Sequence, residues 1–275
     1  MNKYWDWIIG FIAVVALVVG FSAMRHNTVV SVADKVIDRG EIRIGYIVYP
    51  PLLSKDEATG KLSGISYELV EAAAAKLNLK TNWVEEVGWG SALEGLKTKR
   101  YDILGTQMWP NSARAREAVF ADSPFSSGIY PYVRAGDNRF GANLAQFNSP
   151  NITISVVDGE LSQFIAKENL PQAKVNALPQ LASYAESFLN VVNHKADVVF
   201  AEPSSANDFL KTNPGSIQRI GEKPIRMYGL SFAFARGQES MVSMWNVAID
   251  ELVKEDVVST ILEKYNASQD YIINK

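Results

Sequence analysis

Segments with the pattern of a strand and segments with the pattern of a helix alternate along this chain, and this alternation restricts the fold more than any other feature. Residues 41–47 (EIRIGYI) alternate polar and apolar side chains, as a half-buried strand does. Residues 66–77 space their apolar side chains as an amphipathic helix does, with Ser66 placed to cap it. Repeated strand–helix units form largely parallel sheets covered by helices, so we expect an α/β fold.

The strand–helix pattern occurs in two blocks. In the first block we expect strands at 41–47, 81–84 and 101–104, helices at 66–77 and 91–97, and a short helix from Asn111. In the second block we expect strands at 152–157, 174–177 and 196–200, and helices from Glu160, over 179–192 and from about Ser204. A strand at 227–235 and helices at 241–253 and 257–265 follow.

Strand segments near 128–134 and 224–232 connect the two blocks, so the chain crosses between them twice. Two crossings form a hinge about which two lobes can close without unfolding. We expect residues 36–128 and 229–275 to form lobe 1 and residues 129–228 to form lobe 2. A single doubly wound domain is the alternative, which periodicity alone does not exclude.

An apolar run near the N-terminus indicates the compartment. Residues 7–24 contain 18 positions without a charge, a length at the border between a long signal peptide and a transmembrane helix. Ala23 is a candidate last residue before cleavage, but Phe21 stands where a small side chain is wanted. For residues 1–28 we favour a membrane anchor over a cleaved signal. In both cases the rest of the chain is periplasmic or otherwise extracytoplasmic, and an uncleaved helix anchors it to the inner membrane.

Composition excludes several classes of function. The formal net charge of -3 and the pI near 5.6 argue against a nucleic-acid partner, which needs a basic face. The chain has no cysteine, and its histidines are His26 and His194. Thiolate metal sites are therefore excluded and a histidine-rich site is not expected. We expect neither a metal nor a cofactor.

Five stretches carry a resemblance to a known family. They are EIRIGYIVYPPLL, GKLSGISYELVEAAAAKLNL, WGSALEGLKTKRYDIL, NSARAREAVFADSPF and NVAIDELVKEDVVSTILEKY. In this order and spacing they resemble the polar-amino-acid class of bacterial extracellular solute-binding proteins, family 3, from about Lys35 to Tyr265. The resemblance implies a type II periplasmic-binding fold, with lobe 1 built from both chain ends, lobe 2 from the middle, and the ligand in the cleft between them.

Two charged residues are the main candidates for ligand contacts. The resemblance implies that Arg114, in the NSAR turn, grips a carboxylate, which a guanidinium fork matches with two parallel hydrogen bonds. A surface arginine on a short helix, as we expect of Arg116, is the alternative. Glu202 follows the apolar segment ADVVF, where open α/β sheets bind ligands. The resemblance implies that it pairs with an amino group, whereas capping of the next helix is the alternative.

Aromatic and short polar residues complete the expected pocket. The resemblance implies that Tyr49 and Trp89 line it, and two facing aromatic rings would form a slot for a flat or cationic group. A position in the core or at the rim is the alternative for each ring. Thr106 and Gln107 fall where the family contacts its ligand through short polar residues. Trp109 falls where a small residue is common, and it would narrow the cleft or add an aromatic wall.

The segment after residue 157 departs from the family pattern. The family has Gly followed by Thr or Ser, whose hydroxyl and amide groups complete carboxylate binding at a helix N-terminus. Here Gly159 is followed by Glu160, a negative charge in place of the hydroxyl. Pointing into the cleft, Glu160 would repel a carboxylate and attract a second amine. Pointing outward, it would be a favourable acid in the first turn of a helix, and Ser162 would supply the hydroxyl.

These features predict extracytoplasmic binding of a small amine-bearing solute for ABC-type import by cleft closure. An α-amino acid is the first expectation, and a basic or polyamine-like solute is its competitor. The expected partners are an ABC permease and, through residues 7–24, the membrane; we expect a monomer. One alternative is an enzyme on the same scaffold, similar to cyclohexadienyl dehydratase, with Glu202 or Glu160 as general acid. Another is a ligand-sensing accessory module.

Overall fold

A computed structural model describes residues 31–274. The apolar run 7–24, on which the predicted anchor or signal segment rests, lies outside the described residues. In the part of the chain that the structure describes, no helix combines the length and the apolar character needed to cross a membrane.

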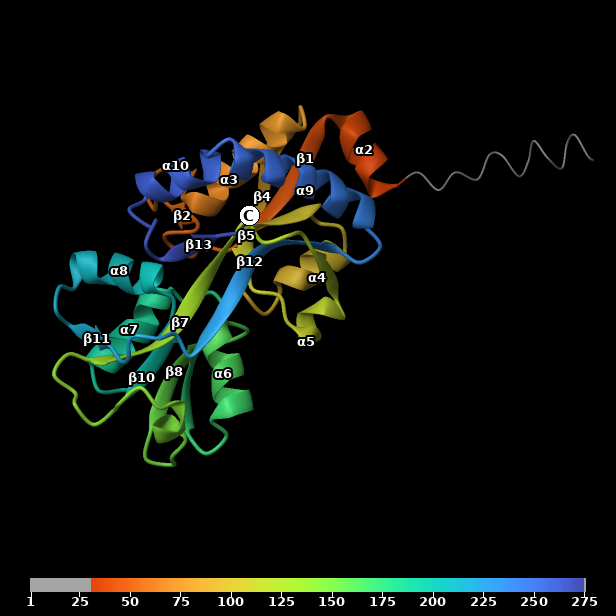
Figure 1. Ribbon diagram of the computed structural model, residues 1–275. Helices are drawn as coiled ribbons and strands as arrows, with labels where there is room; N and C mark the ends of the chain where they lie inside the picture. The colour runs from red at the N-terminus through yellow and green to blue at the C-terminus, as the bar shows by residue number, and fades with distance from the viewer. Residues whose placement is uncertain (1–30, 275) are drawn as a thin grey trace, which may run out of the picture.

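The first block of strands and helices assembles with the last helices of the chain into one α/β body (Figure 1). We call residues 31–124 and 236–266 the first half. Its sheet contains β1 (Glu41–Tyr46) between the parallel strands β4 (Lys80–Glu86) and β5 (Ile103–Met108). Its helices are α2 (Val32–Arg39), α3 (Ile65–Lys76), α4 (Ala92–Lys97), α5 (Ser112–Ala115), α9 (Glu239–Lys254) and α10 (Val257–Lys264). In Figure 1, α3, α9 and α10 lie above the strands and α4 below them.

The second block forms a similar body from residues 135–225, which we call the second half. Its central strand, β8 (Thr153–Val157), runs parallel to β9 (Lys174–Leu178) on one side and to β10 (Val198–Ala201) on the other. Its helices are α6 (Leu161–Asn169), α7 (Tyr184–Val192) and α8 (Pro203–Thr212), with a short 3-10 helix at Leu144–Phe147. Each α-helix follows a strand, as the sequence pattern predicts.

Two long antiparallel strands connect the halves. They are β7 (Phe125–Arg134) and β12 (Arg226–Ala235), and both extend from one half into the other (Figure 1). Strand β12 pairs with β5 and β7, and β7 pairs with β10, so one sheet path passes through both bodies in the order β4-β1-β5-β12-β7-β10-β8-β9. Any change in the angle between the halves must therefore bend these two strands.

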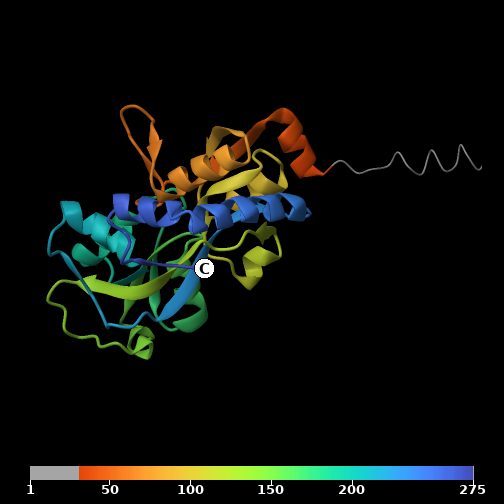
Figure 2. The ribbon, with the colours of Figure 1, turned by 45° about the horizontal axis from the view of Figure 1, so that its top comes forward.

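The structure also contains short elements that the sequence pattern does not predict. They are the hairpin of β2 (Ser54–Lys55) and β3 (Leu62–Ser63), and the strands β6 (Ala118–Phe120), β11 (Ile217–Arg219) and β13 (Tyr271–Ile273). The hairpin projects from the first half (Figure 2). Strands of two or three residues are too short to show an alternating pattern, and helix α2 was also not predicted.

The predicted cap of helix α3 is wrong. The helix begins at Ile65, after Gly64, whose φ of 120° lies in the region that favours glycine. A Cβ at this position would lie 2.5 Å from the carbonyl oxygen of Leu52, so the close approach also requires glycine. Ser66 lies inside the helix, and its buried hydroxyl donates to Gln107 Oε1 over 3.1 Å.

Candidate ligand-binding site

The loops that follow the parallel strands of the two halves meet one another. Open α/β sheets bind ligands beyond the carboxyl ends of their strands. The candidate residues occupy such positions: Tyr49 follows β1, Trp89 follows β4, Arg114 follows β5, Glu160 follows β8 and Glu202 follows β10. All five are buried, although they lie in loops or at helix ends. The contact between the halves is therefore the candidate site.

Two hydrogen bonds join the halves directly. The Tyr49 hydroxyl donates to Glu202 Oε2 over 3.2 Å, and Arg114 Nη2 donates to the carbonyl oxygen of Gly159 over 2.9 Å. Each bond pairs a residue of the first half with one of the second. The structure is thus a state in which the two halves touch at the predicted site.

Arg114 is buried, so the alternative interpretation, a surface arginine on a short helix, is wrong. The Asn111 side chain caps the short helix α5 by accepting from the Arg114 amide over 2.8 Å, which fixes the backbone. Arg114 Nη1 donates to the Trp109 carbonyl oxygen over 2.8 Å, and the guanidinium lies 4.3 Å from the Trp109 ring. Burial lowers the pKa of Arg114 to about 10, and the negative charge of Glu160 opposes this shift. Arg114 therefore stays charged at neutral pH.

Trp109 forms an aromatic wall beneath Arg114. Its ring lies 5.1 Å from that of Phe164 and 5.2 Å from that of Tyr228. Phe164 belongs to helix α6 of the second half, and the Arg114 guanidinium also lies 5.5 Å from its ring. The indole nitrogen of Trp109 is buried and has no hydrogen-bond partner within residues 31–274. Aromatic rings thus surround the guanidinium while carbonyl groups hold it.

A second aromatic cluster surrounds the Tyr49 hydroxyl. The Tyr49 ring lies 5.3 Å from Trp89 and 5.3 Å from Tyr184, with interplanar angles of 88° and 77°. The rings meet edge to face, so in this state they do not form the parallel slot that a flat group would enter. Burial raises the pKa of Tyr49 well above its usual range, so the hydroxyl remains a donor.

Tyr184 is a site residue that sequence reasoning missed. It belongs to the second half, and its buried hydroxyl donates to the Phe200 carbonyl oxygen over 2.5 Å. The predicted helix at 179–192 passes through it, whereas helix α7 begins only at Tyr184. Ser183 and Glu186 form a capping box there, a spacing visible in the sequence that locates the helix start.

Glu202 precedes helix α8 but does not cap it. Its side chain makes no hydrogen bond to the helix backbone, so the capping alternative is wrong, and it accepts from Tyr49 instead. Burial raises the pKa of Glu202 to about 8, and the nearby charge of Glu160 adds to the shift. The hydrogen bond from Tyr49 opposes it. A cationic group beside Glu202 would remove the cost of ionising it.

Glu160 points into the protein, so the outward alternative is wrong; 3% of this residue is exposed. Its Oε2 accepts from the Ser162 amide over 2.8 Å and from the Ser162 hydroxyl over 3.0 Å, and it thereby caps helix α6. Burial raises the pKa of Glu160, while the Ser162 and Leu161 amides and the charge of Arg114 oppose the shift. A carboxylate and a hydroxyl therefore occupy the helix N-terminus where a ligand carboxylate was expected.

Thr106 and Gln107 bond to residues of the first half and of strand β12. The Thr106 hydroxyl donates to the Ile47 carbonyl oxygen over 2.7 Å and accepts from the Ile47 amide over 2.9 Å. Gln107 accepts from Ser66 and donates to the Leu230 carbonyl oxygen over 3.3 Å. In this state both side chains hold strand ends in place, and neither is hydrogen-bonded to Arg114 or Glu202.

The site combines one buried guanidinium with two buried carboxylates. Such a set can bind a molecule that bears both a carboxylate and amino groups, because each buried charge gains an opposite partner. Within residues 31–274, no group of three or more histidine, aspartate or glutamate side chains is arranged to hold a metal ion.

Backbone segments of the two halves approach each other closely at Gly159 and Gly90. Gly159 has a φ of +82°, and a Cβ there would lie 2.7 Å from the Gly90 nitrogen and 2.9 Å from the Trp89 carbonyl carbon. Real Cβ atoms do not approach backbone this closely, so any larger residue at Gly159 would separate the halves. From the second half, the Gln180 side chain lies over Gly88 and Gly90.

Comparison of the sequence with known proteins finds one family and relatives that are named as binding proteins. A family model described as bacterial extracellular solute-binding proteins, family 3, matches residues 42–268. A probable amino-acid ABC transporter-binding protein of Haemophilus influenzae is 23% identical over 247 residues, which cover 88% of this chain and 90% of the relative. The L-arginine-binding protein of Pseudomonas aeruginosa is 23% identical, and the match covers 82% of this chain and 87% of that protein.

Solved structures show the same fold. An ancestral amino acid-binding protein, described as a precursor of cyclohexadienyl dehydratase, has a TM-score of 0.75 and 24% identity over 86% of this chain and 99% of that one. An ancestral arginine-binding protein bound to glutamine has a TM-score of 0.73 and 24% identity over 83% and 99% of the two chains. This chain therefore has the mixed α/β periplasmic-binding-protein fold seen in amino-acid-binding proteins.

Substitution of Gly159 should keep the halves apart. We expect Gly159→Ala to give a larger radius of gyration than the wild type, because its Cβ meets the backbone of Gly90. Gly136→Ala is the matched control: its φ of +78° imposes a similar backbone strain, but nothing lies within 4 Å of its Cβ. Small-angle scattering measures both variants. Equal radii of gyration for Gly159→Ala and the wild type would contradict the claim that the Gly159 contact limits how closely the halves approach.

The pKa of Glu202 predicts a pH-dependent stability. Burial raises this pKa to about 8. The protonated Glu202 side chain therefore stabilises the folded protein at low pH, and this stabilisation is lost as the pH rises through about 8. Glu202→Gln cannot ionise, so we expect it to gain stability relative to wild type between about pH 5 and about pH 8.5. The gain should be at least about 1 kcal/mol, or about 2–4 °C in Tm, by calorimetry of the ligand-free protein. Exposed Glu222→Gln is the control. If the difference in stability between Glu202→Gln and the wild type does not change with pH, the raised pKa of Glu202 is contradicted.

Proposed function

This chain belongs to the bacterial extracellular solute-binding proteins, family 3, and on this basis we propose that it captures an amino acid or a related amine-bearing molecule for an ABC-type importer. One observation supports the proposal most strongly: Arg114 of the first half and Glu160 and Glu202 of the second are buried together where the halves meet. A molecule with a carboxylate and an amino group would satisfy charges on both sides at once.

We propose that binding works by closure of two lobes, as in the type II periplasmic-binding fold. Lobe 1 comprises residues 36–128 and 229–275, and lobe 2 comprises residues 129–228, with β7 and β12 as the hinge. The closed form gains free energy only when a ligand touches both lobes, so the ligand shifts the population toward closure. The hydrogen bonds between the halves support this closed geometry, and a monomer suffices for it.

Arg114 has donors left for a ligand carboxylate. A guanidinium has five N–H donors, and the carbonyl groups of Trp109 and Gly159 use one each. The amino group of the ligand would pair with Glu202, beside the Tyr49 hydroxyl. The rings of Tyr49, Trp89 and Tyr184 would surround its side chain. Thr106, Gln107 and Trp109 would support this pocket, with Ser162 holding Glu160 in place.

The second carboxylate favours a ligand with more than one amine. With both glutamates ionised, the buried set of Arg114, Glu160 and Glu202 carries one net negative charge. A zwitterion leaves that charge uncompensated, whereas a ligand with an additional cationic group neutralises it. We therefore propose a basic amino acid or a related polyamine-like solute in preference to a neutral amino acid. The arginine-binding relatives support this choice.

We also propose that residues 7–24 anchor the protein at the extracytoplasmic face of the inner membrane. A permease of the ABC type would receive the solute there. The amino-acid-binding relatives are named as binding proteins rather than enzymes, so we assign Glu160 and Glu202 to recognition and not to acid catalysis.

Removal of the Arg114 guanidinium should abolish ligand binding. Charge-assisted hydrogen bonds contribute about 1.5–3 kcal/mol each, so losing two lowers affinity by roughly a hundredfold or more. In a thermal-shift screen of amino acids and polyamines, the ligand that stabilises the wild type should leave the Tm of Arg114→Ala unchanged. Exposed Arg116→Ala, two residues away, should keep the full shift. A full shift in Arg114→Ala would refute the proposed grip on the ligand.

Neutralising Glu160 should change ligand preference. We expect Glu160→Gln to bind L-arginine more weakly while its affinity for L-glutamine stays the same or rises, because the negative charge that favours a second cation is lost. The arginine-to-glutamine affinity ratio should fall by about tenfold, the equivalent of about 1.4 kcal/mol. Titration calorimetry measures both affinities. An unchanged ratio would place the second amine away from Glu160.

A further inference from the structure

A basic groove lies beside the first described helix. It has a volume of about 440 Å³, and Lys97, Lys99, Arg116 and Arg236 line it, together with one acidic residue, Glu117. Val32, the first residue of helix α2, also lines the groove. The chain as a whole carries a formal net charge of -3, so this concentration of positive charge is a local property of one surface.

Acidic side chains neutralise little of this charge. Lys97 contacts Glu94 at 3.6 Å, and both are exposed. Arg236 donates to the carbonyl oxygens of Ala115 and Arg116, which positions its guanidinium but leaves its charge. Within residues 31–274, Lys99 and the Arg116 side chain form no ion pair. The groove therefore offers several cations to an external anion.

The groove contains an unused acceptor as well. Gln238 lies between Arg236 and the start of helix α9, lines the groove and is buried. Its side-chain oxygen accepts no hydrogen bond in the described part of the chain. A buried acceptor without a partner costs free energy, which a hydroxyl donor would recover. The groove thus suits a molecule that carries both a phosphate and a hydroxyl group.

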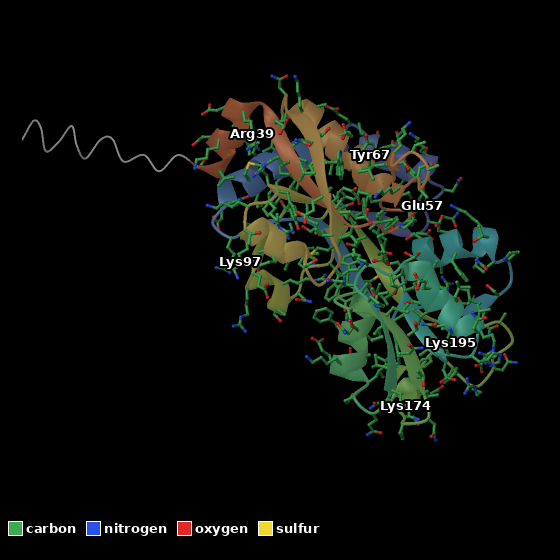
Figure 3. The ribbon with its side chains drawn as sticks, turned by 180° about the vertical axis from the view of Figure 1, so that it is seen from behind. Arg39, Glu57, Tyr67, Lys97, Lys174 and Lys195 are labelled. Carbon is green, nitrogen blue, oxygen red and sulfur yellow. The ribbon has the colours of Figure 1, made fainter. Side chains whose placement is uncertain are left out.

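The short segment between the proposed anchor and helix α2 places the groove near the membrane. Seven residues, 25–31, separate the apolar run 7–24 from helix α2. A fully extended segment of this length spans roughly 25 Å at most, so an anchored chain keeps the start of helix α2 close to the bilayer. Figure 3 shows Lys97 and Arg39 at the end of the molecule where α2 begins, and Lys174 and Lys195 in the second half, away from it.

We propose that this groove binds the headgroups of phosphatidylglycerol and so holds the first half of the protein against the membrane surface. This inference rests on the proposed anchor. Arginine and lysine bond to the lipid phosphate, and the Gln238 side-chain oxygen accepts from a glycerol hydroxyl. The second half remains free to move, so the contact is compatible with closure of the cleft. Because salt screens such a contact, it weakens at high ionic strength.

Energy transfer to the bilayer tests this orientation. The chain has no cysteine, so Ser240→Cys places a single donor dye on the exposed first turn of helix α9, beside the groove. The full chain is reconstituted into vesicles that carry a headgroup-labelled acceptor lipid, either of phosphatidylcholine alone or with phosphatidylglycerol. We expect higher transfer with phosphatidylglycerol, and a fall to the phosphatidylcholine level at high salt. A donor at Lys174→Cys should report the same low transfer in both kinds of vesicle.

Charge reversal separates the groove from general electrostatic attraction. Lys99→Glu with Arg116→Glu should remove the extra transfer from the Ser240→Cys donor. Lys174→Glu with Lys195→Glu, an equal charge change in the second half, should leave it intact. Equal transfer in the two kinds of vesicle, or an equal effect of the two double variants, would overturn the proposal. A chain that does not float with the vesicles would also overturn it, whereas cleft binding measured by thermal shift is a separate result.

Discussion

Burial of unlike charges at the contact between the two halves governs this structure. Arg114 on one side and Glu160 and Glu202 on the other have left water, and no ion pair closes directly between them within the described residues. Carbonyl oxygens hold the guanidinium, and the Ser162 amide and the hydroxyl groups of Ser162 and Tyr49 hold the carboxyl groups. Such an arrangement is costly when empty, because burial leaves Arg114 without an opposite charge in contact and keeps Glu202 protonated up to about pH 8. This cost favours a ligand that carries a carboxylate together with amino groups.

The fold places these groups without specialised architecture. In each half, parallel strands direct their carboxyl ends toward the same edge, and the residues that follow them meet those of the other half. Helix ends then orient individual side chains: Asn111 fixes the backbone of Arg114, and Glu160 caps helix α6. Because β7 and β12 join the halves within one sheet path, any change in the angle between the halves must bend these two strands.

Much of this arrangement could be predicted from the sequence because it depends on local pattern. The strand–helix alternation indicates the α/β fold, and the position of Glu202 directly after the apolar segment ADVVF indicates a residue at a strand end, whereas Arg114 is indicated by the family resemblance. Properties that depend on the other half could not be predicted. The direction of Glu160 is decided by burial against distant residues, and Tyr184 was missed because the helix start at Ser183 was overlooked. The bonding of Thr106 to Ile47 is likewise a contact between residues 59 positions apart in the sequence.

The meeting of Gly159 with Gly90 and Trp89 carries a consequence for how this receptor can diversify. At this contact backbone meets backbone, so the approach of the halves at this point depends on the absence of a Cβ at Gly159. Substitutions could therefore replace the aromatic residues of the site one at a time and change which ligand fits, while this backbone contact stays the same. Ligand preference and the approach of the halves at Gly159 would then be free to change independently.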